Sequence, residues 1–573
     1  MLAPVPVFLA GRPLFHIALA MLFLLLATVA DSQLASAEPL RAERLQLRIG
    51  ALAEDARIAG IPASDPWFLA RFYERREFTP AWHPPAKLDA LLAAIRGSTR
   101  HGLEPEDYHL SALAGLVSTL HDKATAGLAL EVELLATDAL ARLAFHLRFG
   151  KVNPEQIEST WNFSRTMAGV SPVTVVQSLV QSDDLVAALE DYAPDVEYYL
   201  QLVEALAAYR RIAAQDGWPR IEAGETLRIG MSSPRVRVVR ARLAASGDLP
   251  VETEADDPEQ FDEPLEAAVR HFQLRHGLDV DGAIGRRTLA AMNVPVQARI
   301  DQLRVNLERV RWVFRDLEER FLLVNIARFH VLLIEQGRVV WRTRAVVGRP
   351  YRQTPVFKAR MTYLEFNPTW TVPPTILRDD LLPEFRRDPE ALQRRRMSVI
   401  DHQGRRVDPA GIDWSAVTAR TFPYMLRQEP GPENALGRVK FMYPNPYHVY
   451  MHDTPARELF ARAERTFSSG CIRLEDPLGL ARLLLAGTEW DEQAIERVLA
   501  GGRTRIVNLP QPIPVLTLYG TAVAEGGRIH FATDIYNRDA RLLAALDAPF
   551  EFSPPTGYED AVRHENASQS AGP

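Results

Sequence analysis

The chain has 573 residues, enough for about three or four domains, and its 47% hydrophobic and 24% charged content is ordinary for globular protein. The formal net charge of -7 is small for this length, so the composition gives no reason to expect a nucleic-acid partner. One cysteine cannot close a disulfide within the chain, which leaves Cys471 either a buried small side chain or a working nucleophile.

The N-terminus has the pattern of an export signal. Arg12 precedes an apolar run from Leu14 to Ala30, and Ala35-Ser36-Ala37 offers the small residues of a cleavage site. We predict a signal peptide over residues 1–37 and a periplasmic location for the remainder. The alternative is an uncleaved membrane anchor, because the apolar run is at the short end of the length that spans a bilayer.

Residues 38–222 carry apolar side chains at helical spacing. In 128–140 and 196–206 these side chains recur every three or four positions, as they do on the buried face of a helix. No catalytic motif or metal-ligand spacing falls in this region. We therefore predict a helical scaffold domain.

Residues 223–296 are predicted to form three helices, over 234–245, 263–276 and 286–292. Ser233 and Pro234 begin the first helix, and Gly277 ends the second. Most of the other residues that define this pattern are expected to lie in the core or in turns. The pattern resembles peptidoglycan-binding domains of the three-helix type, matching at Leu227, Gly230, Val236, Leu243, Phe272, Gln273, Gly277, Leu278, Asp281, Gly282, Gly285 and Leu289. The resemblance implies the fold and leaves glycan binding open.

A linker helix is predicted over 297–319, and residues 320–510 then change to short β-rich segments separated by turns. Residues 377–430 interrupt the strands with charged, helical sequence and are predicted to cap this domain. Residues 511–551 are predicted to pack on it as a C-terminal extension, and the polar residues 552–573 to be disordered. The predicted fold class is therefore multidomain α+β: a helical scaffold, a three-helix module, and a mostly-β domain with a helical capping insertion.

The residues around Cys471 favour chemistry over packing. Cys471 follows Phe467-Ser468-Ser469-Gly470, and His452 lies 19 residues upstream on a predicted strand. An attacking thiol needs a base, and the carbonyl under attack needs hydrogen-bond donors for its developing charge. We predict Cys471 as the nucleophile and His452 as its base. The alternatives are a buried, inert Cys471 and a turn role for His452.

Three further residues are predicted to orient the reacting groups. Gly470 lets the chain turn sharply, so that the amide N–H groups around Gly470 and Cys471 converge on the substrate oxygen, and the neighbouring Ser469 is predicted to help orient this loop. Tyr450 stands two residues before His452 and therefore shares its strand face. It is predicted to orient the imidazole or donate a hydrogen bond, the alternative being a packing role.

Three other residues are predicted to contact the substrate: Arg473, Ser468 and Trp370. Arg473 would favour the thiolate or hold a carboxylate through two hydrogen bonds, the alternative being a structural ion pair. Trp370 would line the substrate cleft or pack in the core. One cysteine and scattered histidines lack zinc-ligand spacing, so we expect no metal and no cofactor.

Two motifs carry a resemblance to a known family. The segments Met451-His452-Asp453-Thr454-Pro455 and Ser468-Ser469-Gly470-Cys471-Ile472-Arg473-Leu474 resemble the signature of the L,D-transpeptidases, which have a YkuD-like catalytic domain. Further matches are Val347-Gly348, Gln353-Thr354-Pro355, Phe366-Asn367-Pro368-Thr369-Trp370 and Ala435-Leu436-Gly437. The common pattern is S-H-G-C, and this chain has Ser469 in place of the second histidine. The scaffold, module and insertion make it similar to the large YcbB-type subgroup.

The resemblance implies a cysteine-dependent acyltransferase of cell-wall biogenesis. Cys471 would attack a tetrapeptide stem of peptidoglycan and release D-alanine, and the side-chain amine of a second stem would resolve the thioester to a 3→3 cross-link. The expected partners are donor and acceptor stem peptides, and a carbapenem would acylate the same thiol. The alternatives are a cysteine L,D-carboxypeptidase or endopeptidase of the same fold, and a non-catalytic wall-binding scaffold. The sequence leaves the acceptor open.

Overall fold

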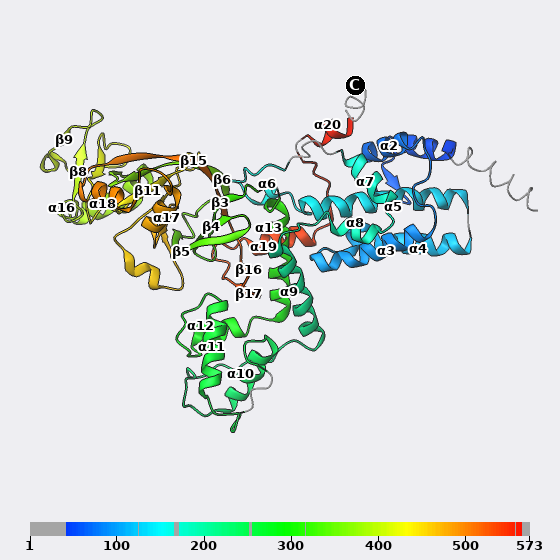
Figure 1. Ribbon diagram of the computed structural model, residues 1–573, viewed down its shortest axis with the longest axis horizontal. Coiled ribbons are helices and arrows are strands. Elements are labelled where there is room, and N and C mark those ends of the chain that lie inside the picture. The colour runs from blue at the N-terminus through cyan, green and yellow to red at the C-terminus, as the bar shows by residue number, and fades with distance from the viewer. Residues whose placement is uncertain are drawn as a thin grey trace, which may run out of the picture.

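The computed structural model describes residues 42–123, 125–165, 171–250, 255–315, 317–555 and 557–563. Figure 1 shows a helical body at one end, a sheet-based body at the other, and a small helical module that projects from between them. The predicted multidomain α+β fold is confirmed. The predicted signal peptide over 1–37 lies outside the described residues. No described helix combines the length and apolar character needed to cross a membrane.

The scaffold is built from helices around one apolar core. The long helix α5 lies at its centre, because nearly every side chain from Val132 to Leu140 is buried. Asp65 begins α2 by accepting hydrogen bonds from Trp67 N and Phe68 N, which satisfies amide groups that a helix leaves free at its start. The main helices are α2 (Pro66–Arg75), α3 (Ala86–Gly97), α4 (Leu110–Asp122), α5 (Ala126–Phe149), α7 (Pro172–Gln181), α8 (Leu185–Glu190) and α9 (Glu197–Ala214).

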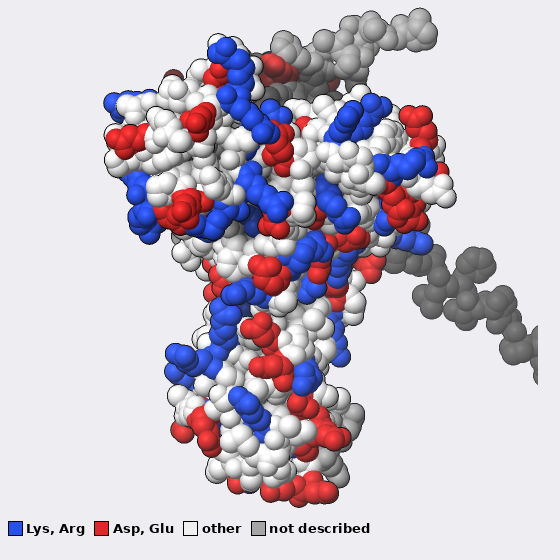
Figure 2. All heavy atoms as spheres, turned by 90° about the vertical axis from the view of Figure 1, so that its left-hand side faces the viewer, with Lys and Arg blue, Asp and Glu red and all other residues white. Residues whose placement is uncertain are grey.

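The module contains the three helices that the sequence predicts: α10 (Pro234–Ala245), α11 (Glu263–Arg275) and α12 (Arg286–Met292). Ser233 begins α10 by accepting from Arg235 N, and Gly277 follows α11 at φ +63°, where glycine is favoured. Phe272 is fully buried in the module core. Figure 2 shows the module projecting below the other domains, with positive and negative side chains interspersed over the visible face.

Helix α13 (Val296–Val313) joins the module to the sheet domain and packs along α9 of the scaffold. Its Glu308 and Arg311 form an ion pair of 2.6 Å with both side chains fully buried. Glu308 also accepts from Val152 N at 2.7 Å, and Arg311 donates to the carbonyl of His101 and to the Tyr199 hydroxyl, both at 2.9 Å. The pair therefore fixes α13 against the scaffold with its polar atoms satisfied.

Replacing Glu308 with Ala should lower the free energy of unfolding by about 3–5 kcal/mol, because it leaves the Arg311 charge buried without its partner. Urea unfolding followed by circular dichroism measures this change. Glu318→Ala is the matched control: Glu318 pairs with Arg360 at 2.5 Å where both side chains are about half exposed, and an exposed pair contributes at most about 1 kcal/mol. Equal losses in the two variants would contradict the expectation.

The large sheet of the C-terminal half has the strand order β13-β5-β14-β12-β11-β6-β15-β3-β4. Strand β5 also pairs with β4, so the sheet closes on itself, and its apolar side chains fill the interior. Helices α17 (Pro477–Leu484) and α18 (Glu492–Ala500) add to this core. The strands are β3 (Arg320–Asn325), β4 (His330–Glu335), β5 (Arg338–Gly348), β6 (Phe357–Phe366), β11 (Val439–Met442), β12 (Met451–His452), β13 (Thr466–Ser468), β14 (Ile472–Leu474) and β15 (Arg505–Leu518).

The insertion at 377–430 forms a cap with its own apolar core around Phe385 and Trp414. Its helical part is a π-helix over Leu377–Leu381 followed by α15 (Leu382–Arg387) and α16 (Ala391–Arg394). The cap also has a small sheet that the sequence did not predict, and the strand just before the insertion, β7 (Trp370–Thr371), joins it. The other strands are β8 (Met397–Ile400), β9 (Arg406–Val407) and β10 (Met425–Gln428), and the order in the sheet is β7-β10-β8-β9.

The C-terminal extension contacts all three domains. After β15 it forms the hairpin β16 (Ala522–Glu525) and β17 (Arg528–Phe531) and the helix α19 (Asp539–Asp547). The Ile529 carbonyl accepts from Arg275 of the module at 2.7 Å, and Leu546 O accepts from Lys151 of the scaffold at 2.6 Å.

The prediction of disorder over 552–573 is wrong for residues 557–563, which contain helix α20 (Tyr558–Arg563). Tyr558 and Val562 pack against Phe149, and the Tyr558 hydroxyl donates to Asp65 at 3.0 Å. The segment is polar overall, so its sequence gave no sign that Tyr558 and Val562 pack against the scaffold. Residues 564–573 lie outside the described ranges.

Candidate active site

The parallel pair β12–β14 brings the predicted catalytic residues to one place. Met451 pairs with Ile472 and His452 with Arg473, and Ile472 N donates to Tyr450 O at 3.1 Å. Because side chains alternate along a strand, Tyr450, His452, Cys471 and Arg473 all project from the same face. Cys471 lies opposite Tyr450 and one diagonal step from His452, a separation of about 8 Å between α-carbons by strand geometry.

His452 is held in one tautomer. Its side chain is buried, and Nδ1 lies 2.6 Å from the carbonyl oxygen of its neighbour Asp453, which can only accept a hydrogen bond. Nδ1 therefore carries the proton, and Nε2 is left as the acceptor that a base needs. Burial, with the nearby charges of Arg473 and Lys440, lowers the pKa of His452 to about 3, so the imidazole is neutral at neutral pH.

Cys471 is partly buried, and burial raises the pKa of its thiol above the usual range. Other groups lower the pKa of the thiol by stabilising the thiolate. These are the backbone N–H and the hydroxyl of Tyr450, which donate hydrogen bonds, and the positive charges of Lys440 and Arg473. The sequence argument expects His452 to ionise Cys471. The burial of both groups instead favours a neutral thiol beside a neutral imidazole as the resting form, with proton transfer occurring during attack.

Alkylation of Cys471 by iodoacetamide should therefore accelerate continuously from pH 6 to pH 9. Below a raised pKa the thiolate fraction, and with it the rate, rises about tenfold for each pH unit. The rate constant at each pH, measured from intact mass, checks this. A plateau beginning near pH 5 would show a preformed thiolate–imidazolium pair and contradict a raised thiol pKa.

The loop before Cys471 is fixed by its own side chains. Ser468 is 2% exposed; its hydroxyl donates to Cys471 O at 2.5 Å and accepts from Gly470 N at 3.1 Å. A substrate-binding role for Ser468 does not fit this position, because its hydroxyl is already engaged inside the loop. Gly470 adopts φ +115°, which only glycine tolerates well, and its N–H is not free for a substrate oxygen. The Cys471 N–H has no acceptor within the described residues, so it is the backbone donor of this loop that remains available to a substrate oxygen.

Arg473 carries its charge on the site face without an ion pair among the described residues. Its Nε is buried and makes no hydrogen bond, and burial lowers the pKa of the guanidinium. On the other side of His452, Lys440 pairs with Glu365 at 3.7 Å and stands 4.5 Å from the centre of the Tyr450 ring. The sequence reasoning missed Lys440, although its place on a strand next to the histidine strand was a usable signal.

Arg352 is a second residue that the sequence reasoning missed. It donates to the Ser469 hydroxyl at 2.9 Å and forms ion pairs with Asp379 at 3.1 Å and Asp380 at 2.5 Å. Both aspartates belong to the cap, so Arg352 ties the cap to the loop that carries Cys471. Ser469, at the position where the common pattern has histidine, is the residue of this loop that Arg352 contacts. Trp370 lies in β7 and is half-buried against the apolar core of the cap.

Three family models match the chain. Residues 319–498 match the L,D-transpeptidase catalytic domain, 68–206 match a scaffold domain, and 232–292 match a domain described as "Putative peptidoglycan binding domain". This is a multidomain protein with an L,D-transpeptidase catalytic domain, and the order of its domains fits the YcbB-type architecture. The Cys471 site lies inside the matched catalytic domain.

Two curated proteins and a solved structure show similarity. A "Putative L,D-transpeptidase" of Haemophilus influenzae is 36% identical over 244 residues, covering 43% of this chain and 49% of that protein. The N-acetylmuramoyl-L-alanine amidase CwlM of Mycobacterium tuberculosis is 41% identical over 80 residues, covering 13% of this chain and 20% of that protein. The chain thus matches about half, or less, of the length of these relatives. The crystal structure of an L,D-transpeptidase from Xylanimonas cellulosilytica is 16% identical, covering 52% of this chain and 99% of that chain, with a TM-score of 0.17.

Proposed function

We propose that this protein is a peptidoglycan L,D-transpeptidase that forms 3→3 cross-links through a thioester on Cys471. The observation that carries the proposal is the placement of Cys471, His452, Tyr450 and Arg473 on one face of β12 and β14, inside an L,D-transpeptidase catalytic domain. A nucleophile, an acceptor nitrogen and a hydrogen-bond donor are the parts that acyl transfer needs, and a guanidinium without an ion pair among the described residues can attract a substrate carboxylate.

The first half-reaction makes the thioester. His452 Nε2 takes the thiol proton while the sulfur attacks the carbonyl between the L-centre of the diamino acid and the terminal D-alanine. The Cys471 N–H donates to the oxygen as it gains negative charge. The C–N bond then breaks, the proton passes from the imidazole to the leaving amine, and D-alanine departs. The Arg473 guanidinium is suited to bind the terminal carboxylate of the donor, because its Nε has no hydrogen-bond partner in the part of the chain that the structure describes.

The second half-reaction uses the side-chain amine of another stem peptide. His452 Nε2 takes a proton from this amine as it attacks the thioester, and the thiol leaves with that proton. The amide energy is preserved in the thioester, so the reaction needs no external energy source. The ion pairs from Arg352 to the cap support transfer to an amine over hydrolysis, since a cap held over the loop limits the access of water.

Incubation of the full chain with disaccharide tetrapeptide tests the proposal. Mass spectrometry should find a cross-linked dimer and free D-alanine. A tripeptide monomer without dimer would identify an L,D-carboxypeptidase, and unchanged substrate would identify a non-catalytic wall-binding protein. A carbapenem should add its mass to the peptide that contains Cys471. We also propose that the mature chain acts in the periplasm, because peptidoglycan stems, its proposed donor and acceptor, lie there.

A further inference from the structure

We propose that Tyr536, in the C-terminal extension, is a positioning residue that aims the Cys471 N–H at the substrate oxygen. The inference rests on the proposed thioester chemistry of Cys471. Tyr536 lies beyond the matched catalytic domain, which ends at residue 498. The C-terminal extension would thus complete the active site from outside that domain.

The orientation of the Cys471 N–H depends on the carbonyl of Gly470. A trans peptide unit is planar, and its C=O and N–H point in opposite directions. The Gly470 carbonyl accepts a hydrogen bond from the Thr354 hydroxyl at 2.9 Å. This bond directs the C=O toward Thr354 and therefore directs the N–H of Cys471 away from it, toward the side where it has no acceptor within the described residues.

Thr354 is itself held on two sides. It is 0% exposed, and its hydroxyl oxygen accepts a hydrogen bond from Gly348 N at 2.9 Å. The single proton of the hydroxyl is donated to the carbonyl of Gly470, which can only accept. The segment between Gly348 and Thr354 turns tightly: a β-carbon on Gly348 would stand 2.1 Å from the carbonyl oxygen of Arg352. The Thr354 hydroxyl keeps its place only while this turn keeps its shape.

The Tyr536 hydroxyl holds the two ends of the turn together. It donates to Gly348 O at 2.6 Å and accepts from Thr354 N at 3.2 Å. These three groups are buried, so without the hydroxyl a carbonyl and an amide would be left unsatisfied. One oxygen atom therefore sets the spacing of Gly348 and Thr354, and through them the Gly470–Cys471 peptide unit.

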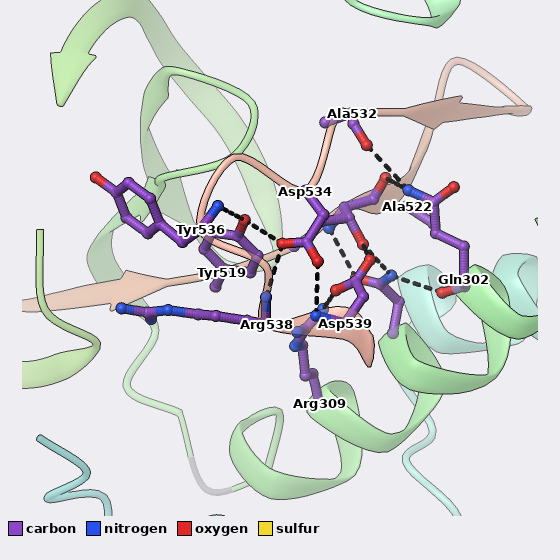
Figure 3. Close-up of polar contacts among 12 residues, drawn as sticks. Gln302, Arg309, Tyr519, Ala522, Ala532, Asp534, Tyr536, Arg538 and Asp539 are labelled. Carbon is purple, nitrogen blue, oxygen red and sulfur yellow. Dashed lines mark hydrogen bonds and ion pairs between the residues drawn. The ribbon is translucent and has the colours of Figure 1, made fainter. Parts of the chain in front are cut away.

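Tyr536 is fixed from the opposite side by the network in Figure 3, where its hydroxyl points away from the cluster around Asp534. Tyr536 N donates to the Tyr519 hydroxyl at 3.0 Å, which donates to Asp534 at 2.6 Å. The same carboxylate accepts from the backbone of Asp539, which pairs with Arg309 of α13 at 2.6 Å. The turn beside Cys471 is thus anchored to the helix that joins the domains.

Two rates on the full chain separate positioning from other effects. Acylation of Cys471 by a carbapenem passes through a tetrahedral oxyanion and needs the N–H donor. Alkylation by iodoacetamide has no oxyanion and depends on the thiol alone. Tyr536→Phe should slow acylation about tenfold or more and leave the alkylation rate at the same pH unchanged. Thr354→Val should have the same two effects, and Thr354→Ser, which keeps the hydroxyl, should restore acylation. Because both residues act through the same peptide unit, the double variant Tyr536→Phe/Thr354→Val should acylate no more slowly than the slower single variant.

Tyr558→Phe is the matched control, because Tyr558 is 7% exposed against 6% for Tyr536 and also donates one hydrogen bond to another element. It should leave both rates unchanged. An unchanged acylation rate in Tyr536→Phe, or equal slowing of both reactions, would overturn the positioning role. If carbapenem leaves the peptide containing Cys471 unmodified in the unsubstituted chain while iodoacetamide labels it, the proposed acyl-enzyme chemistry fails, and this inference fails with it.

Discussion

Cys471→Ala should produce no dimer and no carbapenem adduct, with a loss of at least about 10⁴-fold in the rate of D-alanine release. The chain has one cysteine, so no second thiol can replace the nucleophile. Cys471 is partly buried and lies at the site face rather than in the core, so its removal should leave the fold intact. Product formation measured by mass spectrometry, together with an unchanged thermal unfolding midpoint, checks both statements.

Cys471→Ser serves as the companion variant. Serine has the same side-chain connectivity as cysteine, but its hydroxyl ionises far less readily than the thiol, so acyl transfer should remain near the level of the alanine variant. Dimer formation at the unsubstituted rate in either variant would mean that another group attacks the donor. A carbapenem adduct that persists in Cys471→Ala would place the acylated residue elsewhere.

His452→Gln should slow D-alanine release by about 10²- to 10⁴-fold, the range that a general base contributes. Glutamine is close to the imidazole in size and can still donate to the Asp453 carbonyl, so packing changes little. It cannot take the thiol proton. Because Ser469 stands where the common pattern has histidine, no second imidazole is available in the motif to compensate.

The pH dependence of His452→Gln distinguishes a base from a residue that only packs. The remaining activity should rise as the pH approaches the pKa of the thiol, because hydroxide-driven ionisation then replaces the lost base. A constant fractional loss across pH 6 to pH 9 would indicate a purely structural role for His452. An activity equal to that of the unsubstituted chain would remove His452 from the mechanism.

Local patterns were enough to predict much of the fold. The helices 234–245 and 286–292 were predicted with the bounds that the structure gives them, because capping residues and apolar spacing act within a few positions of the chain. The strands of the cap were not predicted, since β7 to β10 are two to four residues long and pair only with one another. Helix α20 was missed because its stability comes from contacts with α2 and α5, more than 400 residues away in the sequence.

The sequence by itself determined the chemistry that this protein has available. A single thiol among small polar residues, a histidine 19 positions before it and an arginine two positions after it define the candidate site without any coordinates. Only the tertiary structure decided whether these groups are charged and which residues hold them in place. Burial disfavours charge on both Cys471 and His452, Ser468 is engaged inside its own loop, and Arg352 and Tyr536 reach that loop from distant segments. Desolvation and long-range hydrogen bonds exist only when the chain is folded, so no local pattern of residues can encode them.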